Sequence, residues 1–212
     1  MRVPLDAKDG EQTIFDGLIA AREKFGDKEI LEDLDRKPLT YTGLIRAAFV
    51  LGRKIANMTD KGERVAILLP SSMGVVVTFF GLHAHGRVPV MLNFTAGEAN
   101  LKAAIKASGV RKILTARRFI EQAKLDDLIV ELETVAEVVW LDDVRKTIGI
   151  QDKLYGLLAG FAPKRFRVKT EADSPGVEVP LANLLWRLQP PPGYQVIDST
   201  GTVLYTGEKP EP

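Results

Sequence analysis

The segment from Gly62 to Asn93 restricts the fold of this chain more than any other part of its sequence. It holds three apolar runs, at 65–69, 73–83 and 88–92, with a Pro-Ser-Ser break after the first and a glycine before the third. A short run that is apolar at every position is typical of a parallel strand covered on both faces. Two parallel strands need a crossover, and the middle run is long enough to form its helix. We therefore predict a right-handed β-α-β unit, whose helix can be capped by Ser71-Ser72.

Alternating helix and strand patterns extend this unit into an α/β domain over residues 1–170. The expected helices are 13–25, 42–58, 73–83, 98–108 and 116–125, and the expected strands are 28–35, 39–41, 65–69, 88–92, 110–115 and 135–141. Gly109 should end its helix as a left-handed C-cap. Strands that alternate with helices favour a three-layer fold with a mainly parallel sheet, whereas the first two strands should form a hairpin.

The same periodicity predicts which side chains are buried. In the first helix, the apolar face should consist of Ile14, Leu18, Ala21 and Phe25. Burial of a Leu or Ile side chain stabilises a domain by about 1.5–3 kcal/mol. The expected core includes Leu18, Leu44, Ala48, Val65, Ile67, Leu69, Val76, Phe79, Val90, Leu92, Ile105, Ile113, Leu114 and Val138.

The composition excludes several classes of function. The formal net charge of +1 leaves no basic surplus for general nucleic-acid binding. The chain has no cysteine, which excludes disulfides, thiolate zinc sites and a cysteine nucleophile, and its two histidines cannot form a dedicated metal site alone. Residues 1–12 lack the apolar core of a signal peptide, and no apolar run is long enough to span a bilayer. We therefore expect a cytoplasmic protein that binds no nucleic acid.

Residues 171–212 differ in character and are expected to form a proline-rich tail. Eight of the twelve prolines lie at or after Pro163. Helical periodicity persists only over 181–188, and the segment 195–205 has the pattern of a hairpin that turns at 199–201. The 181–188 segment carries four leucines and a tryptophan, which is too apolar for a solvated linker. We expect it to pack on the α/β domain or across the interface of a homodimer.

Three motifs in the first half of the chain resemble the opening of the adenylate-forming acyl-acid ligases, the AMP-binding synthetases. They are Leu39-Thr40-Tyr41, then "G-E-R-V-A-I-L-L-P-S-S" at 62–72, and "V-P-V-M-L-N" at 88–93. The family shows "L-T-Y-x-x-L", "G-D/E-R-V-A-I-L-L-P-N/S-S" and "G-A-V-x-V-P-L-N" at the corresponding places. The resemblance extends over residues 12–173 and implies the N-terminal subdomain of that ligase fold.

Two further motifs narrow the resemblance. The letters "L-N-F-T-A-G" at 92–97, with the pattern at 113–120, resemble the long-chain acyl-ACP ligase module of bacterial bifunctional acylglycerophosphoethanolamine acyltransferase/acyl-ACP synthetases. This resemblance implies a parent enzyme that uses ATP and Mg²⁺ to convert a fatty acid to an acyl-adenylate. The acyl group then passes to acyl carrier protein or coenzyme A. In that scheme the region that resembles the family supports the acyl pocket.

The loop that holds the ATP phosphates in this family has no counterpart in the sequence. Its motif, "T-S-G-S/T-x-G-x-P-K-G", supplies backbone N–H donors and a lysine. The resemblance places its strand near 171–175, where the chain instead continues "G-V-E-V-P". We therefore expect a truncated N-terminal region that is not competent alone and holds neither ATP nor Mg²⁺, and we assign no catalytic, cofactor-binding or metal-binding residue. The alternative is a non-catalytic accessory module that binds an acyl chain, a membrane surface or a protein partner.

Two histidines and two acidic pairs are the candidate polar sites. His83 and His85 allow two interpretations. They could be proton carriers near neutral pH, or they could mark a helix end at which one histidine interacts with the terminal carbonyls, and the second interpretation is favoured. Asp126-Asp127 and Asp142-Asp143 allow either a metal site or solvated caps at helix starts, and caps are favoured.

Residues 148–169 combine an apolar helical face with a basic cluster. Four apolar residues recur at the spacing i, i+3, i+4 and i+7, and four basic residues follow with no acidic residue between them. These are Leu154, Leu157, Leu158 and Phe161, then Lys164, Arg165, Arg167 and Lys169. One interpretation is a peripheral helix on anionic lipid at the inner membrane face. A core-packing helix with a solvated basic end is the commoner case and is favoured.

Overall fold

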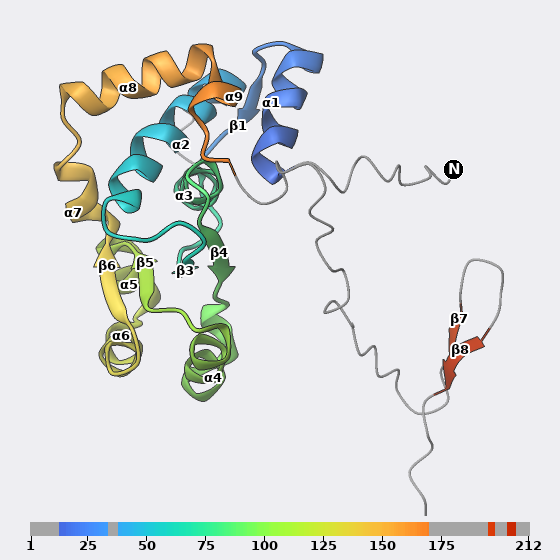
Figure 1. Ribbon diagram of the computed structural model, residues 1–212. Coiled ribbons are helices and arrows are strands. Elements are labelled where there is room, and N and C mark those ends of the chain that lie inside the picture. The colour runs from blue at the N-terminus through green and yellow to red at the C-terminus, as the bar shows by residue number, and fades with distance from the viewer. Residues whose placement is uncertain (1–12, 34–37, 170–194, 198–202, 207–212) are drawn as a thin grey trace, which may run out of the picture. The chain divides into compact units, whose positions relative to one another are not determined.

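The computed structural model describes residues 13–33, 38–169, 195–197 and 203–206 (Figure 1). The chain divides into two units, Met1–Pro175 and Gly176–Pro212. In the first unit four parallel strands form one sheet in the order β4-β3-β5-β6. They are β3 (Arg64–Ile67), β4 (Val88–Met91), β5 (Lys112–Thr115) and β6 (Glu137–Trp140). The predicted α/β fold with a mainly parallel sheet is confirmed.

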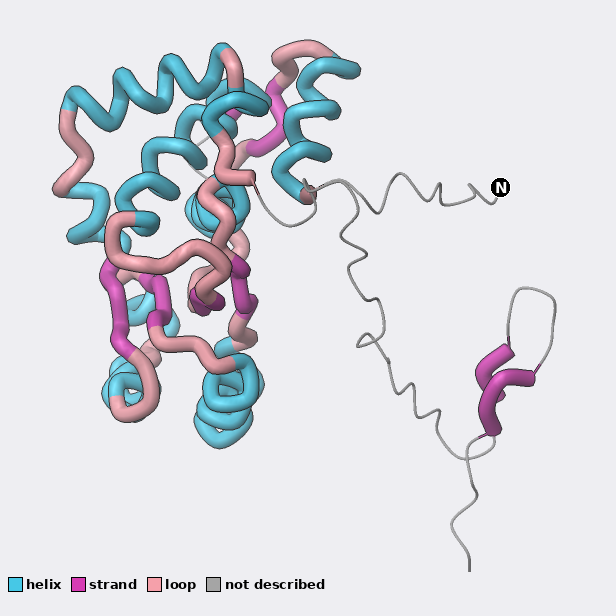
Figure 2. The backbone as a smooth tube through the Cα atoms, viewed as in Figure 1, coloured by secondary structure: helices cyan, strands magenta, loops and turns pink. Residues whose placement is uncertain are grey.

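Helices cover both faces of this sheet (Figures 1 and 2). One face packs against α2 (Tyr41–Ala56) and α3 (Met73–Ala84), and the other against α4 (Glu98–Ser108), α5 (Arg117–Ala123) and α6 (Asp126–Glu133). Val65 and Ile67 lie in the α2–α3 core, whereas Ala66 and Leu68 lie in the α4–α6 core, and all four are fully buried. This two-sided burial explains why the run at 65–69 is apolar at every position.

Further helices and strands complete the description of the two units. The additional helices are α1 (Ile14–Phe25), the 3-10 turn η2 (Phe94–Ala96), α7 (Leu141–Lys146), α8 (Ile150–Phe161) and α9 (Pro163–Phe166). The predicted antiparallel pair forms between β1 (Glu29–Leu31) and β2 (Leu39–Thr40). In the second unit β7 (Gln195–Ile197) and β8 (Val203–Thr206) also pair antiparallel, as expected for the tail hairpin. The turn at 199–201 and the helix expected at 181–188 lie outside the described residues.

The buried face of α1 differs from the prediction. Phe15 and Ile19 are fully buried, whereas Ile14 and Phe25 are 53% and 49% exposed. Phe15 packs edge-on against Phe49 of α2, with ring centroids 5.3 Å apart. The prediction is confirmed for Leu18, which is buried, but was wrong for Ile14 and Phe25. The reason is that α1 carries two overlapping apolar arcs, and the contact with α2 selects between them.

Most of the predicted core is buried in the structure. Nine of the fourteen expected residues are buried, and the other five are half-buried. The half-buried residues are Leu69, Val76, Phe79, Val90 and Val138. Val90 is partly exposed because β4 is an edge strand, whose outer side lacks a neighbouring strand among the described residues. Gly109 has the left-handed conformation predicted for a C-cap, with φ 66° and ψ 27°.

The N-terminus of α3 is capped by a residue that the sequence pattern did not indicate. Ser72 occupies the N-cap position, but its hydroxyl donates to the carbonyl of Pro70 at 3.3 Å and makes no cap bond. The backbone N–H of Met73 donates instead to the carboxylate of Asp33, also at 3.3 Å. The expected serine cap was therefore wrong, because a carboxylate 40 residues earlier lies against the helix end.

Two glycines allow α2 and α3 to lie in close contact. A Cβ atom added to Gly52 would lie only 2.3 Å from the carbonyl oxygen of Gly81 and 2.7 Å from Cδ2 of His85. A side chain at either glycine would therefore push the helices apart.

Candidate functional site

The carboxyl ends of β3 and β5 mark the topological switch point of the sheet. The chain leaves β3 through α3 on one face and leaves β5 through α5 on the other, and these two strands are neighbours. Open α/β sheets bind ligands in the crevice at such a point. Thr115 is fully buried there, and its hydroxyl donates to the carbonyl of Leu68 at 2.8 Å. This hydrogen bond links the carboxyl ends of β3 and β5. We take the edge of the sheet at these strand ends as the candidate site, because it contains the switch point.

Arg117 organises the charged part of this edge. Its guanidinium donates to Asp143 at 2.6 Å and lies 4.8 Å from the ring centroid of Trp140. Its backbone N–H donates to the carboxylate of Asp142 at 2.8 Å. Hydrogen bonds from Arg117 and then Lys146 lower the pKa of Asp143, and the bond to Asp143 raises the pKa of Arg117. Asp143 is therefore held ionised and paired with two cations at this edge.

The acidic pairs at helix starts differ in their roles. Asp142 does cap a helix, but that helix is α5 rather than the one in which Asp142 lies. Asp126 and Asp127 lie in the first turn of α6, whose N-cap is Leu125, so they interact with the helix dipole and were wrongly predicted as caps. Within residues 13–33 and 38–169, no group of three or more Asp, Glu or His side chains is arranged to hold a metal ion.

Both histidines are packed against aromatic rings. His85 is 5% exposed, and its Nε2 lies 3.3 Å from the carbonyl oxygen of Phe49, to which the neutral ring donates. Burial, followed by the nearby charge of Arg87, lowers the pKa of His85 to about 4. Burial also lowers the pKa of His83, whose ring packs on that of Phe79 with the ring centroids 4.7 Å apart. His85 is therefore not the histidine expected to interact with the terminal carbonyls of its helix, because its partner Phe49 lies in the middle of α2.

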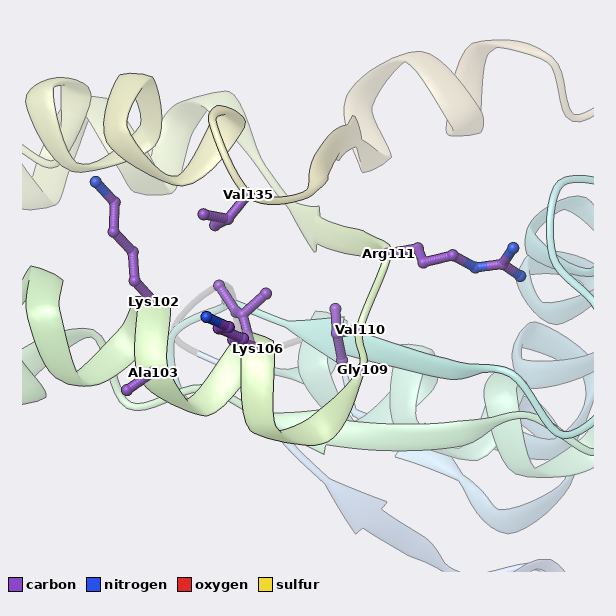
Figure 3. Close-up of a pocket in the computed structure, with 8 residues that line it drawn as sticks. Lys102, Ala103, Lys106, Gly109, Val110, Arg111 and Val135 are labelled. Atoms are coloured by element: carbon purple, nitrogen blue, oxygen red, sulfur yellow. The ribbon is translucent and has the colours of Figure 1, made fainter.

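A shallow cavity of about 490 Å³ lies at the opposite edge of the sheet, between α4 and the segment before β6 (Figure 3). Val110 and Val135 give it apolar walls. Lys102 on its rim pairs with Glu98 and Glu131, at 2.9 and 2.6 Å. Arg111 extends away from the other labelled side chains. The cavity thus combines apolar walls with the paired cation Lys102, and it lies at the amino ends of the strands, away from the switch point.

The apolar face of α8 is exposed, contrary to the favoured interpretation of a core-packing helix. We call its five residues the α8 surface. They are Ile150 (85% exposed), Leu154 (55%), Leu157 (42%), Leu158 (51%) and Phe161 (75%). The opposite side of α8 packs on α2 through Gly156, Ala159 and Gly160, which are buried. A Cβ atom on Gly156 would lie 2.3 Å from Cγ2 of Val50, so only small residues fit between the helices.

Comparison with known proteins identifies the family. Residues 19–176 match the family model described as AMP-binding enzyme, which is more than half of the chain. The chain belongs to the AMP-binding enzyme family. This assignment agrees with the parallel sheet and with the motifs at 62–72 and 88–93.

Solved structures of similar fold are larger than this AMP-binding chain. VinN in complex with 3-methylaspartate is 20% identical with a TM-score of 0.54, and the match covers 70% of this chain and 38% of VinN. O-succinylbenzoate coenzyme A synthetase (MenE) from Bacillus subtilis, in complex with AMP, is 20% identical with a TM-score of 0.53, and the match covers 64% of this chain and 33% of MenE. The N-terminal subdomain of Klebsiella oxytoca NpsA is 19% identical with a TM-score of 0.51, and the match covers 65% of this chain and 33% of the NpsA chain. The chain thus spans well under half of these proteins, and the similarity shows the fold.

The switch-point residues Thr115 and Arg117 were not among the residues predicted from the sequence. Their signal was available, since polar residues that directly follow an apolar strand lie at its carboxyl end. Arg117, which begins α5 just after β5, is paired with Asp143. None of the described residues forms a glycine-rich loop that carries a lysine.

Proposed function

We propose that this polypeptide is the N-terminal subdomain of an AMP-forming ligase for long-chain fatty acids. The intact enzyme would use ATP and Mg²⁺ and pass the acyl group to acyl carrier protein or coenzyme A, in the cytoplasm. The match of residues 19–176 to AMP-binding enzymes carries this proposal. The motif at 92–97 supports the acyl-ACP branch, and in the structure it forms a defined turn in which Asn93 accepts from the N–H and hydroxyl of Thr95 at 3.1 and 2.8 Å.

In this proposal the 212 residues do not form an acyl-adenylate alone. The phosphate-binding motif has no counterpart in the sequence, so nothing assigned here holds the triphosphate. The test is ATP–pyrophosphate exchange with long-chain fatty acids, with MenE and o-succinylbenzoate as the positive control. We expect no exchange above background. Exchange by this chain alone would show that the phosphates are bound by residues other than the family motif.

A second candidate function is a non-catalytic module that binds an acyl chain, a membrane surface or a protein partner, including a second copy of the chain. The exposed α8 surface favours this candidate. The homodimer is tested by sedimentation velocity of the full chain and of residues 1–175. If the tail covers apolar surface within or between copies, its removal lowers solubility or changes the oligomeric state. A shortened protein that stays a soluble monomer with unchanged melting would rule out that role.

A further inference from the structure

The α8 surface is exposed because α8 cannot rotate to bury it. A Cβ atom on Gly160 would lie 2.6 Å from Cγ of Arg46, and at Gly156 the space is smaller still. Asp152, on the buried side, is held by Lys54 at 2.7 Å. At the other end of the helix, Arg22 of α1 donates to the carbonyl of Gly160 at 2.7 Å. These contacts lock the small residues inward, so the five large apolar side chains point away from α2 as a consequence of the fold.

Apart from Asp152, the charged residues of the segment 148–169 are all basic. Lys153 lies beside the apolar stripe, and Arg165 and Lys169 follow it, all exposed. Lys164 pairs with Glu23 on α1, at 2.9 Å. The acidic residue within 148–169, Asp152, is buried and paired with Lys54, so it does not offset this charge at the surface.

We propose that the α8 surface docks the protein on an anionic lipid membrane, with α8 lying in the plane of the interface. A helix with large apolar residues on one side and Lys and Arg at its margins inserts its apolar face below the headgroups while the cations contact anionic lipid. The twelve residues of α8 span about 18 Å, which suits a helix that lies on a membrane. No helix within the described ranges is long and apolar enough to cross a bilayer.

A second copy of the chain fits this surface less well than anionic lipid. In a two-fold dimer the same surface meets itself, so the margins that carry Lys153 and Arg165 would place basic residues in a common interface. Anionic headgroups would instead supply negative charges opposite these basic residues. The proposal concerns lipid contact alone and requires neither ATP nor fatty acid, so it stands or falls independently of the ligase proposal.

The experiment is co-sedimentation of the full chain with vesicles of phosphatidylcholine, with and without phosphatidylglycerol. We expect binding only to vesicles that contain phosphatidylglycerol, and weaker binding as salt is added. The double variant Leu154→Gln/Phe161→Gln should bind at least about tenfold more weakly. Its matched control is Val130→Gln on α6, because Val130 is similarly exposed, at 63%, and should leave binding unchanged.

A second pair of variants tests the charges. Lys153→Glu/Arg165→Glu should lower the affinity for phosphatidylglycerol vesicles, whereas Lys106→Glu on α4, also exposed, should have a much smaller effect. All these positions are exposed, so circular dichroism and melting should match the parent protein. The proposal would be overturned if the affinity for vesicles were the same with and without phosphatidylglycerol, or if both double variants bound vesicles as tightly as the parent protein. So would absence of vesicle binding together with a dimer that the Leu154→Gln/Phe161→Gln variant dissociates, since the α8 surface would then be a protein interface.

Discussion

Replacement of Gly52 by alanine should destabilise the domain although alanine is the better helix former. The new Cβ atom would lie 2.3 Å from the carbonyl oxygen of Gly81, about 1 Å closer than an ordinary contact. That oxygen belongs to a helix backbone and cannot rotate away, so α2 and α3 must separate. Overpacking of this kind costs about 1–3 kcal/mol, and the better helix propensity of alanine offsets about 0.5–1 kcal/mol. We expect a net loss of about 1–2 kcal/mol.

Thermal unfolding followed by circular dichroism measures this loss. In a domain of this size each kcal/mol shifts Tm by about 2–4 °C, so Gly52→Ala should lower Tm by about 2–8 °C. Gly17→Ala is the matched control, since Gly17 also lies in a helix but has no atom within 4 Å of the added Cβ. That substitution should raise Tm by about 1–4 °C. A Gly52→Ala protein that melts at or above the parent temperature would refute the close α2–α3 contact.

Three further outcomes follow from buried and capping groups. Burial holds the pKa of His85 at about 4 against an ordinary 6.5, so the unfolded chain takes up a proton that the folded chain does not. The free energy of unfolding should therefore fall by up to about 3 kcal/mol as the pH drops from about 6.5 to about 4. When it is measured by urea unfolding at several pH values, it should depend less steeply on pH in His85→Gln than in the parent protein. An equal dependence on pH would contradict the assignment. Ile67→Asp places a carboxylate in the fully buried centre of β3 and should abolish the folded state, as judged by loss of the far-ultraviolet signal. Asp33→Ala removes the acceptor for the N–H of Met73 and should cost about 1 kcal/mol in urea unfolding, whereas an unchanged midpoint would show that the cap contributes nothing.

The sequence by itself determined the layered α/β core. A strand apolar at every position has to be covered on both faces, and the run at 65–69 is divided between two helical layers as predicted. Helix and strand periodicity also located the elements that flank it, and Gly109 marked the end of α4. These features depend on neighbouring residues along the chain, so local patterns carry the information.

Only the tertiary structure decided which apolar faces are buried and which polar groups meet. Periodicity shows that α1 and α8 have apolar faces, but the partner decides the orientation. Phe49 selects the face of α1, and Gly156 and Gly160 turn the large residues of α8 outward. The cap that Asp33 provides for α3 joins groups 40 residues apart, and Asp142 likewise caps α5 from 25 residues away. The candidate site at the strand ends is likewise made by long-range pairing, because the bond from Thr115 to Leu68 exists only once β3 and β5 are neighbours.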